Sequence, residues 1–153
     1  MSIFHSMNTT SSALTSQRLR MDVISSNMAN VDTTRGKLVN GEWEPYRRKT
    51  VTFQSKNNSF SGFLNRAVNS KGSQNYGNGV KVTRINEDHE TPFKSVYDPR
   101  HPDANEDGYV QLPNVDPLRE MVDLISATRS YEANVTVLNA TKGMLMKSLE
   151  IGK

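Results

Sequence analysis

The side chains that could do acid–base or metal chemistry are scattered along this chain of 153 residues. Its three histidines, His5, His89 and His101, lack the spacing of metal ligands on one helix face, so each is expected to be an ordinary surface histidine. No GxSxG, GxxxxGK[ST] or GxGxxG motif occurs. The absence of cysteine excludes disulfides and thiolate metal sites. We therefore expect no catalytic residue, no bound metal, no cofactor and no enzyme activity.

One acidic stretch comes close to a calcium-binding pattern. DANEDG, residues 103–108, offers oxygen ligands at alternate positions and then a glycine, as the first half of a calcium loop does. Asn114 stands where that loop requires a bidentate Glu, however, and the proline-rich flanks are not helical. Asp, Asn and Gly also form ordinary turns. We interpret the stretch as a rigid turn, with calcium binding as the alternative.

The first 31 residues have the apolar spacing of a helix and an unusual opposite face. Apolar residues recur every seven positions, with a second, partly occupied position between them: Met7, Leu14, Met21 and Met28, with Ile24 and Val31. The other faces are Ser, Thr and Asn, and the charged residues are Arg18, Arg20 and Asp22. Such a face is soluble, yet its desolvation costs little. The segment predicts a helix that becomes ordered when other subunits surround it.

The far end of the chain repeats this pattern with a clearer start. Its apolar residues lie seven apart or between those positions: Leu124, Tyr131, Leu138 and Leu145, with Val135 and Leu149. Asp116 is a candidate N-cap, Pro117 suits the first helical position and Glu120 suits the first turn. Because the chain leaves and returns, we expect the terminal helices to pair as an antiparallel, coiled-coil-like hairpin.

The middle of the chain is strand-like rather than helical. KTVTFQ (49–54) and VKVTRIN (80–86) alternate and are rich in β-branched residues, and PFKSVYD and GYVQL are shorter candidates. Asn78-Gly79 is a turn signal before the second strand, and the composition of about 55–78 predicts a flexible insertion. We expect an α+β fold in three parts: an N-terminal helix over 1–34, a small, mainly β domain over 35–115 and a C-terminal helix over 116–153.

Charge and hydropathy narrow the range of partners. The net charge is +3, but charges of both signs are interleaved, so nucleic-acid binding is not expected. The mean hydropathy is −0.65. No run approaches the roughly 18 apolar residues of a membrane span, and we expect no membrane insertion. The N-terminus also lacks the basic and apolar regions of a secretory signal.

Several stretches resemble a known family. SSNMANVDTTRG is similar to the N-terminal signature of the bacterial flagellar axial proteins of the rod and hook. VYDPRHPDAN, YVQLPNV and SYEANVTVLNATK, in that order, resemble subunits of the proximal rod. The resemblance covers nearly the whole chain and is weakest from Ser55 to Asn78. It implies a structural subunit of the drive shaft between the motor ring and the hook, exported by the flagellar type III apparatus.

The resemblance also implies how such a subunit assembles. The terminal helices would form the inner layer of a hollow helical tube, with the middle domain outside them. The implied partners are other rod proteins, copies of the same chain and the export apparatus, and the implied location is the flagellar basal body in the cell envelope. The implied subunit-packing residues are the two apolar stripes and two asparagines: Met7, Leu14, Met21, Ile24, Asn27, Met28, Asn30, Val31, Leu124, Tyr131, Val135, Leu138, Leu145 and Leu149.

Other interpretations of the same residues stay open. The stripes could serve as ordinary packing within one chain. A cytosolic helical adaptor or chaperone could bind partners through them, although a permanently soluble adaptor should carry more Lys and Glu on the polar face of the first helix. An envelope-associated enzyme would need an acid–base or metal cluster, for which DPRHPDANED is the candidate.

Overall fold

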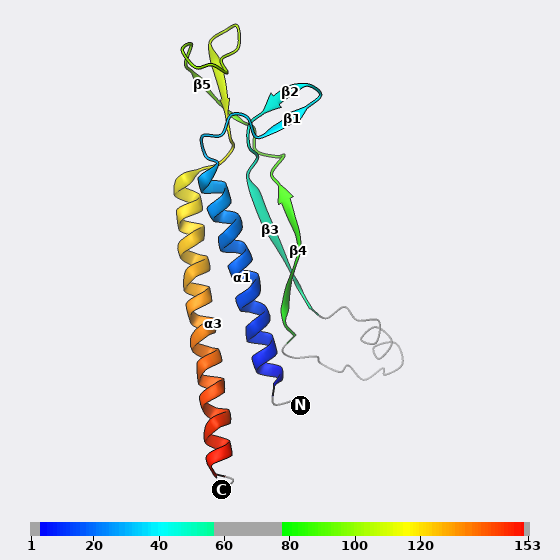
Figure 1. The fold of residues 1–153 in the computed structure, drawn as a ribbon, viewed down its shortest axis with the longest axis vertical. Coiled ribbons are helices and arrows are strands. Elements are labelled where there is room, and N and C mark those ends of the chain that lie inside the picture. The colour runs from blue at the N-terminus through cyan, green and yellow to red at the C-terminus, as the bar shows by residue number, and fades with distance from the viewer. Residues whose placement is uncertain (1–3, 57–77, 152–153) are drawn as a thin grey trace, which may run out of the picture. The chain divides into compact units, whose positions relative to one another are not determined.

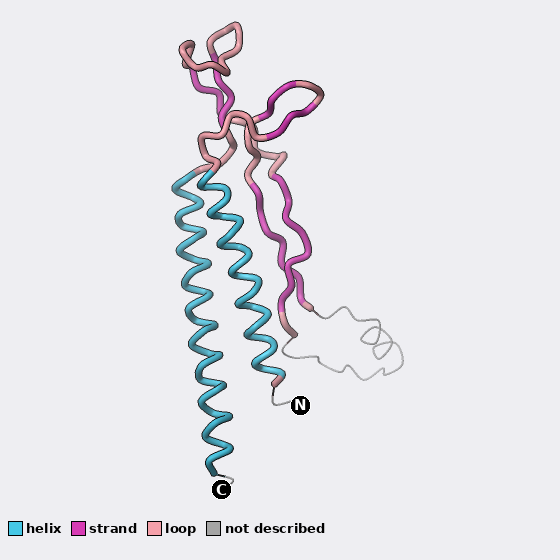
Figure 2. The backbone as a smooth tube through the Cα atoms, viewed as in Figure 1, coloured by secondary structure: helices cyan, strands magenta, loops and turns pink. Residues whose placement is uncertain are grey.

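The computed structural model describes residues 4–56 and 78–151, and these form two long helices and three two-stranded sheets (Figures 1 and 2). The expected insertion at about 55–78 lies almost entirely outside the described residues. The α+β class is confirmed. The elements in chain order are α1 (His5–Ala29), β1 (Lys37–Val39), β2 (Glu42–Glu44), β3 (Lys49–Ser55), β4 (Val80–Glu87), β5 (Lys94–Tyr97), β6 (Tyr109–Leu112) and α3 (Pro117–Ile151).

The C-terminal helix α3 begins where the sequence predicts. The Asp116 carboxylate accepts a hydrogen bond from the N–H of Leu118 at 3.1 Å, so Asp116 is the N-cap. Pro117 occupies the first helical position, where its missing N–H leaves no donor unpaired. Glu120 lies in the first turn, where the helix dipole favours a negative charge. Local capping chemistry therefore sets the start of this helix.

The hairpin of β1 and β2 is an element that the alternation of residues does not reveal. Leu38 lies opposite Trp43 in it. The turn is Asn40-Gly41, and both residues have positive φ, 53° and 92°. Asn-Gly is the preferred pair for such a turn. The turn signal was thus present in the sequence, but the flanking strands of three residues each are too short to show a pattern.

The four strands expected from the sequence form the other two sheets. β3 pairs with β4, and the N–H of Lys56 donates to the carbonyl of Gly79 at 2.7 Å beyond one end of the pair. β5 pairs antiparallel with β6, which places Tyr97 opposite Tyr109. The two tyrosine rings meet edge to face with centroids 5.3 Å apart. Period-two alternation therefore located these strands correctly.

Part of the polar face of α1 packs against β4 of the same chain, although the sequence analysis assigned that face to neighbouring subunits. The Ser12 hydroxyl accepts a hydrogen bond from the N–H of Val80 at 3.0 Å. Gly79, expected as part of a turn, makes this close approach possible, because a Cβ there would lie 2.4 Å from the Ser12 Oγ. A small polar residue on α1 and a glycine before β4 thus fit each other.

The chain gathers into two compact units. Unit 1 comprises Met1–Leu19, Thr52–Arg84 and Ala127–Lys153, and unit 2 comprises Arg20–Val51 and Ile85–Ser126. Both long helices contribute to both units, and the expected division into three consecutive parts stays a prediction. Neither described helix has the apolar stretch that crossing a membrane requires.

The two units differ in their apolar cores. Among the described residues, the buried hydrophobic side chains of unit 2 are Val23, Ile24, Val110 and Val115, whereas unit 1 has only Ala127. The buried polar residues of unit 1 are Thr10, Ser16 and Thr141, and each hydroxyl donates to a carbonyl of its own helix four residues earlier. Over the described residues, unit 2 therefore has a small apolar core, and unit 1 has a single buried hydrophobic side chain.

Candidate functional site

The predicted subunit-packing residues are divided between the two units. Those in unit 2 are Met21, Ile24, Asn27, Met28, Asn30, Val31 and Leu124, and those in unit 1 are Met7, Leu14, Tyr131, Val135, Leu138, Leu145 and Leu149. Ile24 and Asn27 are buried, Leu149 is exposed and all the others are half-buried. Leu149 is uncovered because α3, with 35 residues, runs on past the start of α1, which has 25 (Figure 1).

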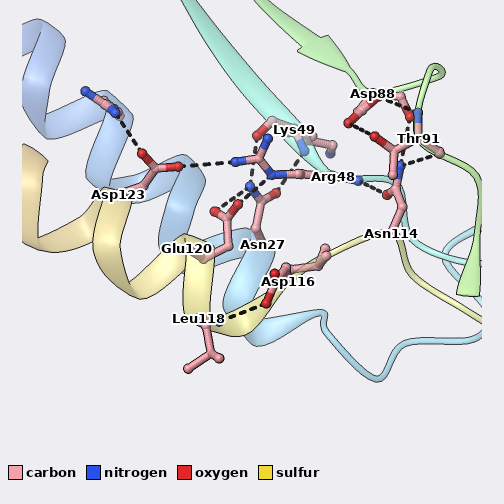
Figure 3. A network of polar contacts seen from close by, with 12 residues as sticks. Asn27, Arg48, Lys49, Asp88, Thr91, Asn114, Asp116, Leu118, Glu120 and Asp123 are labelled. Atoms are coloured by element: carbon pink, nitrogen blue, oxygen red, sulfur yellow. Dashed lines mark hydrogen bonds and ion pairs between the residues drawn. The ribbon is translucent and has the colours of Figure 1, made fainter.

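Asn27, near the end of α1, is a fully buried polar residue that joins three parts of unit 2 (Figure 3). Its Oδ1 accepts the N–H of Lys49 at 2.9 Å and the Tyr46 hydroxyl at 3.0 Å. Its Nδ2 donates to the carbonyl of Lys49 at 2.8 Å and to the Glu120 carboxylate at 3.0 Å. The side-chain amide thereby pairs with both backbone groups of the first residue of β3. All its hydrogen-bonding capacity is used.

Glu120, on the first turn of α3, lies at the centre of a charged cluster (Figure 3). Its side chain is fully buried and accepts a hydrogen bond from Nε of Arg48 at 2.5 Å. Arg48 also reaches Asp123 at 3.3 Å, and Arg20 of α1 pairs with the same Asp123 at 3.2 Å. Two arginines thus face two carboxylates, and the formal charges cancel. We call Asn27, Arg48, Glu120 and Asp123 the polar network.

Asn114 extends these contacts to the segment before α3 (Figure 3). Its Oδ1 accepts the N–H of Arg48 at 2.7 Å, and its Nδ2 donates to the carbonyls of Asp88 and Thr91, each at 3.0 Å. The pKa of the Asp88 carboxyl is lowered, mainly because the backbone N–H and the hydroxyl of Thr91 donate to it. Asn114 therefore holds the chain between β4 and β5 against the start of β3.

Asn30, the other asparagine of the SNMAN stretch, makes its hydrogen bonds at the helix end. Its Nδ2 donates to the carbonyl of Ser26 at 2.8 Å, and its Oδ1 accepts the Thr33 hydroxyl at 3.2 Å. The side chains of Asn27 and Asn30 thus both make hydrogen bonds within this chain near the end of α1.

The DANEDG stretch forms a turn whose first carboxylate is held by the segment after α1. Asp103 accepts hydrogen bonds from the Thr34 hydroxyl at 2.7 Å and from the Arg35 guanidinium. Arg35 and then Thr34 are the main reasons why the pKa of Asp103 lies below its ordinary value. Over the described ranges, no group of three or more His, Asp or Glu residues is arranged to hold a metal ion. His5, His89 and His101 are far apart in the chain, and His101 accepts the N–H of Asp103 at its Nδ1.

A second apolar surface lies on α3 and is exposed. Leu118, Val122 and Ile125 follow the i, i+4, i+7 spacing of one helix face, and they are 75%, 67% and 59% exposed. Further along the helix, Val137, Met144 and Ile151 are also exposed and lie seven residues apart. We call these six side chains the outer apolar residues of α3. The helix is thus apolar beyond its predicted stripe.

The sequence analysis missed the partners of the two asparagines. Arg48, Tyr46 and Asn114 were not singled out, because nothing local to YRRK or PNVD distinguishes a residue that contacts a distant helix end. Glu120 was expected only as a favourable negative charge in the first turn of the helix, and nothing local marks it as buried. The outer apolar residues are also present in the sequence, but they lie outside the one seven-residue repeat from which the packing residues were predicted.

Two family models match this chain. Residues 7–36 match the flagella basal body rod protein model, and residues 106–151 match the C-terminal model of the flagellar basal body rod FlgEFG proteins. The class of protein is therefore that of the flagellar basal-body rod proteins, which are structural proteins and not enzymes. The expectation of no enzyme activity agrees with this class.

Individual relatives narrow the class further. The flagellar basal-body rod protein FlgC of Bacillus subtilis (strain 168) is 68% identical over 153 residues, which is 100% of both chains. The FlgC protein of Borreliella burgdorferi is 44% identical over 99% of this chain and 98% of its own, and that of Escherichia coli O157:H7 is 40% identical over 100% of both. The chain belongs to the FlgC family of flagellar basal-body rod proteins.

Proposed function

We propose that this chain is a structural subunit of the proximal rod, exported by the flagellar type III apparatus and polymerised into a hollow helical drive shaft. Its partners are other rod proteins, copies of itself and, during export, the export apparatus. Its location is the basal body in the cell envelope. Membership in the FlgC family supports the assignment of this chain to the flagellar rod. The proposal that the chain polymerises rests on the exposure of the outer apolar residues of α3.

A helix that is apolar on more than one face is normally buried. The predicted packing residues of α3 other than Leu149 are half-buried in the single chain, whereas its outer apolar residues are exposed. A row of exposed apolar side chains of this kind marks a protein interface. Contacts of this face with a different face of a neighbouring subunit are heterologous, and repeated heterologous contacts build a helical filament rather than a closed dimer.

The terminal helices pair along their lengths, in our proposal, as an antiparallel coiled-coil-like hairpin. Two contacts in unit 2 support the antiparallel direction of the helices: Arg20 contacts Asp123, and Asn27 contacts Glu120. Residue numbers therefore rise along one helix as they fall along the other. The predicted packing residues named above form the seam. The same residues would share the torsional load of the rod with their neighbours.

The small core of unit 1 supports ordering upon assembly. Fixing the backbone costs roughly 1–2 kcal/mol per residue. Among the described residues of unit 1, only Ala127 is a buried hydrophobic side chain that can offset this cost. The start of α1 and the far half of α3 therefore become ordered when neighbouring subunits cover them. A marginally stable terminus also suits export, which requires a largely unfolded chain.

Amide exchange on the dilute, full-length chain tests this difference between the units. We expect slow exchange at the end of α1 and the start of α3, residues 20–29 and 118–126, because the polar network and the core of unit 2 hold them. The amides of 5–19 and 130–151 should exchange fast and become protected only in assembled rods. Uniform protection of both helices in the dilute chain would contradict ordering upon assembly.

Deletion of residues 2–31 tests the export and assembly functions of the first helix. We expect a strain that carries this deletion in place of the native protein to be non-motile, with the truncated chain in the cytoplasm or exported without a completed hook. Retention in the cytoplasm would locate an export signal in the segment, and export without a hook would locate an assembly function. Normal motility with a normal hook would contradict the proposal.

The helical adaptor or chaperone is the weaker alternative. The family membership does not favour it. The polar face of the first helix also lacks the Lys and Glu that a permanently soluble adaptor should carry.

A further inference from the structure

A hollow of about 390 Å³ lies in unit 2 between the β1–β2 hairpin and the β5–β6 hairpin. Its volume is near the lower end of the range of about 300–1,000 Å³ that is typical of small-molecule sites. The residues around it are Thr34, Glu42, Trp43, Pro45, Asp103, Ala104, Asn105 and Gln111. No residue of the polar network lines this hollow.

The walls of the hollow are tied together. Asp103, on the loop of the β5–β6 hairpin, is bonded by Thr34 and Arg35, which precede the β1–β2 hairpin. The N–H of Tyr46, just after that hairpin, donates to the carbonyl of Thr33 at 3.1 Å. The contacts of Asp103 thus join the loop of one hairpin to the start of the other, and the Tyr46 contact closes the base of the β1–β2 hairpin.

The groups around the hollow are free to bind a ligand. Trp43 is 57% exposed. Within the described part of the chain, the side chains of Glu42, Trp43, Asn105 and Gln111 make no hydrogen bond. The indole and the two amides can donate, and the amides and the carboxylate can accept. An aromatic face is thus surrounded by mixed donors and acceptors.

We propose that this hollow binds a neutral oligosaccharide. The indole of Trp43 would stack on the apolar C–H face of a sugar ring, since aromatic side chains combine an apolar face with a polar edge. Hydroxyl groups both donate and accept, and this matches the amides of Asn105 and Gln111 and the carboxylate of Glu42. The proposal goes beyond the rod function and does not depend on it.

The composition of the hollow favours a sugar over two other ligands. A cationic side chain could lie over Trp43, but it offers donors only and would leave the amide N–H groups without acceptors. A protein partner would require a more apolar centre, whereas Trp43, Pro45 and Ala104 are the apolar residues that surround this hollow.

The emission of Trp43 tests the proposal directly, because Trp43 is the single tryptophan of the chain. The full-length protein is titrated with tetrasaccharides of N-acetylglucosamine, β-linked glucose and α-linked glucose. We expect a saturable change in emission with at least one of them, and heat of binding by calorimetry. Gln111→Ala should weaken this binding about tenfold, because the proposed hydrogen bond from the amide to the sugar is lost. Trp43→Ala should abolish the heat.

Leu38→Ala is the matched control. Leu38 is an exposed apolar residue directly opposite Trp43 in the same hairpin, but it does not line the hollow, so this variant should bind as the unchanged chain does. Circular dichroism confirms that each variant folds. Three results would overturn the proposal: no saturable change up to about 10 mM sugar, binding that survives both Trp43→Ala and Gln111→Ala, or emission that depends on protein concentration alone, which would identify a protein contact.

Discussion

Replacing Glu120 by alanine should lower the free energy of unfolding of this chain by about 3–5 kcal/mol, because it removes one partner of a buried ion pair. Glu120 is fully buried, and its two oxygens accept hydrogen bonds from Arg48 and Asn27. The side chain of Arg48 is only 13% exposed, so water cannot replace the lost carboxylate well. The Nδ2 group of Asn27 also loses one acceptor. A domain stable by about 5–15 kcal/mol would lose a large part of its stability.

Urea unfolding followed by circular dichroism measures this effect. Glu132→Ala is the matched control, since it is the same substitution on the same helix, in an exposed pair with Arg129. Exposed pairs contribute about 0–1 kcal/mol, so the control should unfold nearly as the unchanged chain does. Glu120→Gln keeps the shape of the side chain, so its loss in free energy of unfolding should lie between those of Glu120→Ala and Glu132→Ala. If Glu120→Ala and Glu132→Ala lowered the free energy of unfolding equally, the polar network would not be what holds the helix ends together.

The parts of the fold that the sequence predicted are those that local chemistry determines. Asp116 and Pro117 start α3 because a cap and a proline act within one turn. β3 and β4 follow from alternation along single strands. The missed hairpin also had a local signal in Asn40-Gly41, and a search for such pairs independent of strand length would find it.

The polar network could not be predicted, because its contacts join residues far apart in the chain. Asn27 and Glu120 are 93 residues apart, and Arg48 and Glu120 are 72 apart. Each of these residue types is ordinarily found at the surface. Nothing within a short window marks one as buried, so only the fold brings them together. The resemblance of the SNMAN stretch to a family signature singled out Asn27 without indicating its partners.

The network and the apolar stripes do different things for the two long helices. A buried polar residue accepts only the register that satisfies its hydrogen bonds, whereas an apolar stripe tolerates sliding. We infer that the network sets the register of α1 against α3 in unit 2. Among the described residues, unit 1 buries one hydrophobic side chain, that of Ala127, and we propose that neighbouring subunits stabilise the rest of both helices.

Val122→Lys should abolish motility while leaving the single chain folded. Val122 is exposed, and surface substitutions of this kind change stability by about 0.5 kcal/mol or less. In the rod, by contrast, the same position would lie against an apolar surface, where an unpaired ammonium group is strongly unfavourable. We therefore expect an unchanged urea midpoint for the purified chain, and non-motile cells without hooks when the variant replaces the native protein.

Val122→Leu is the control at the same position. It distinguishes the effect of the added charge from the effect of changing the side chain at all, because leucine keeps the surface apolar and favours the helix. This control should remain motile. The export of both variants is compared by detecting them outside the cytoplasm, so that a failure of export is not taken for a failure of assembly. If the lysine variant is exported and the cells swim normally, the outer apolar residues of α3 are not a subunit interface. Polymerisation must then rely on the predicted subunit-packing residues alone, and the outer apolar residues of α3 would be exposed to solvent in the assembled rod.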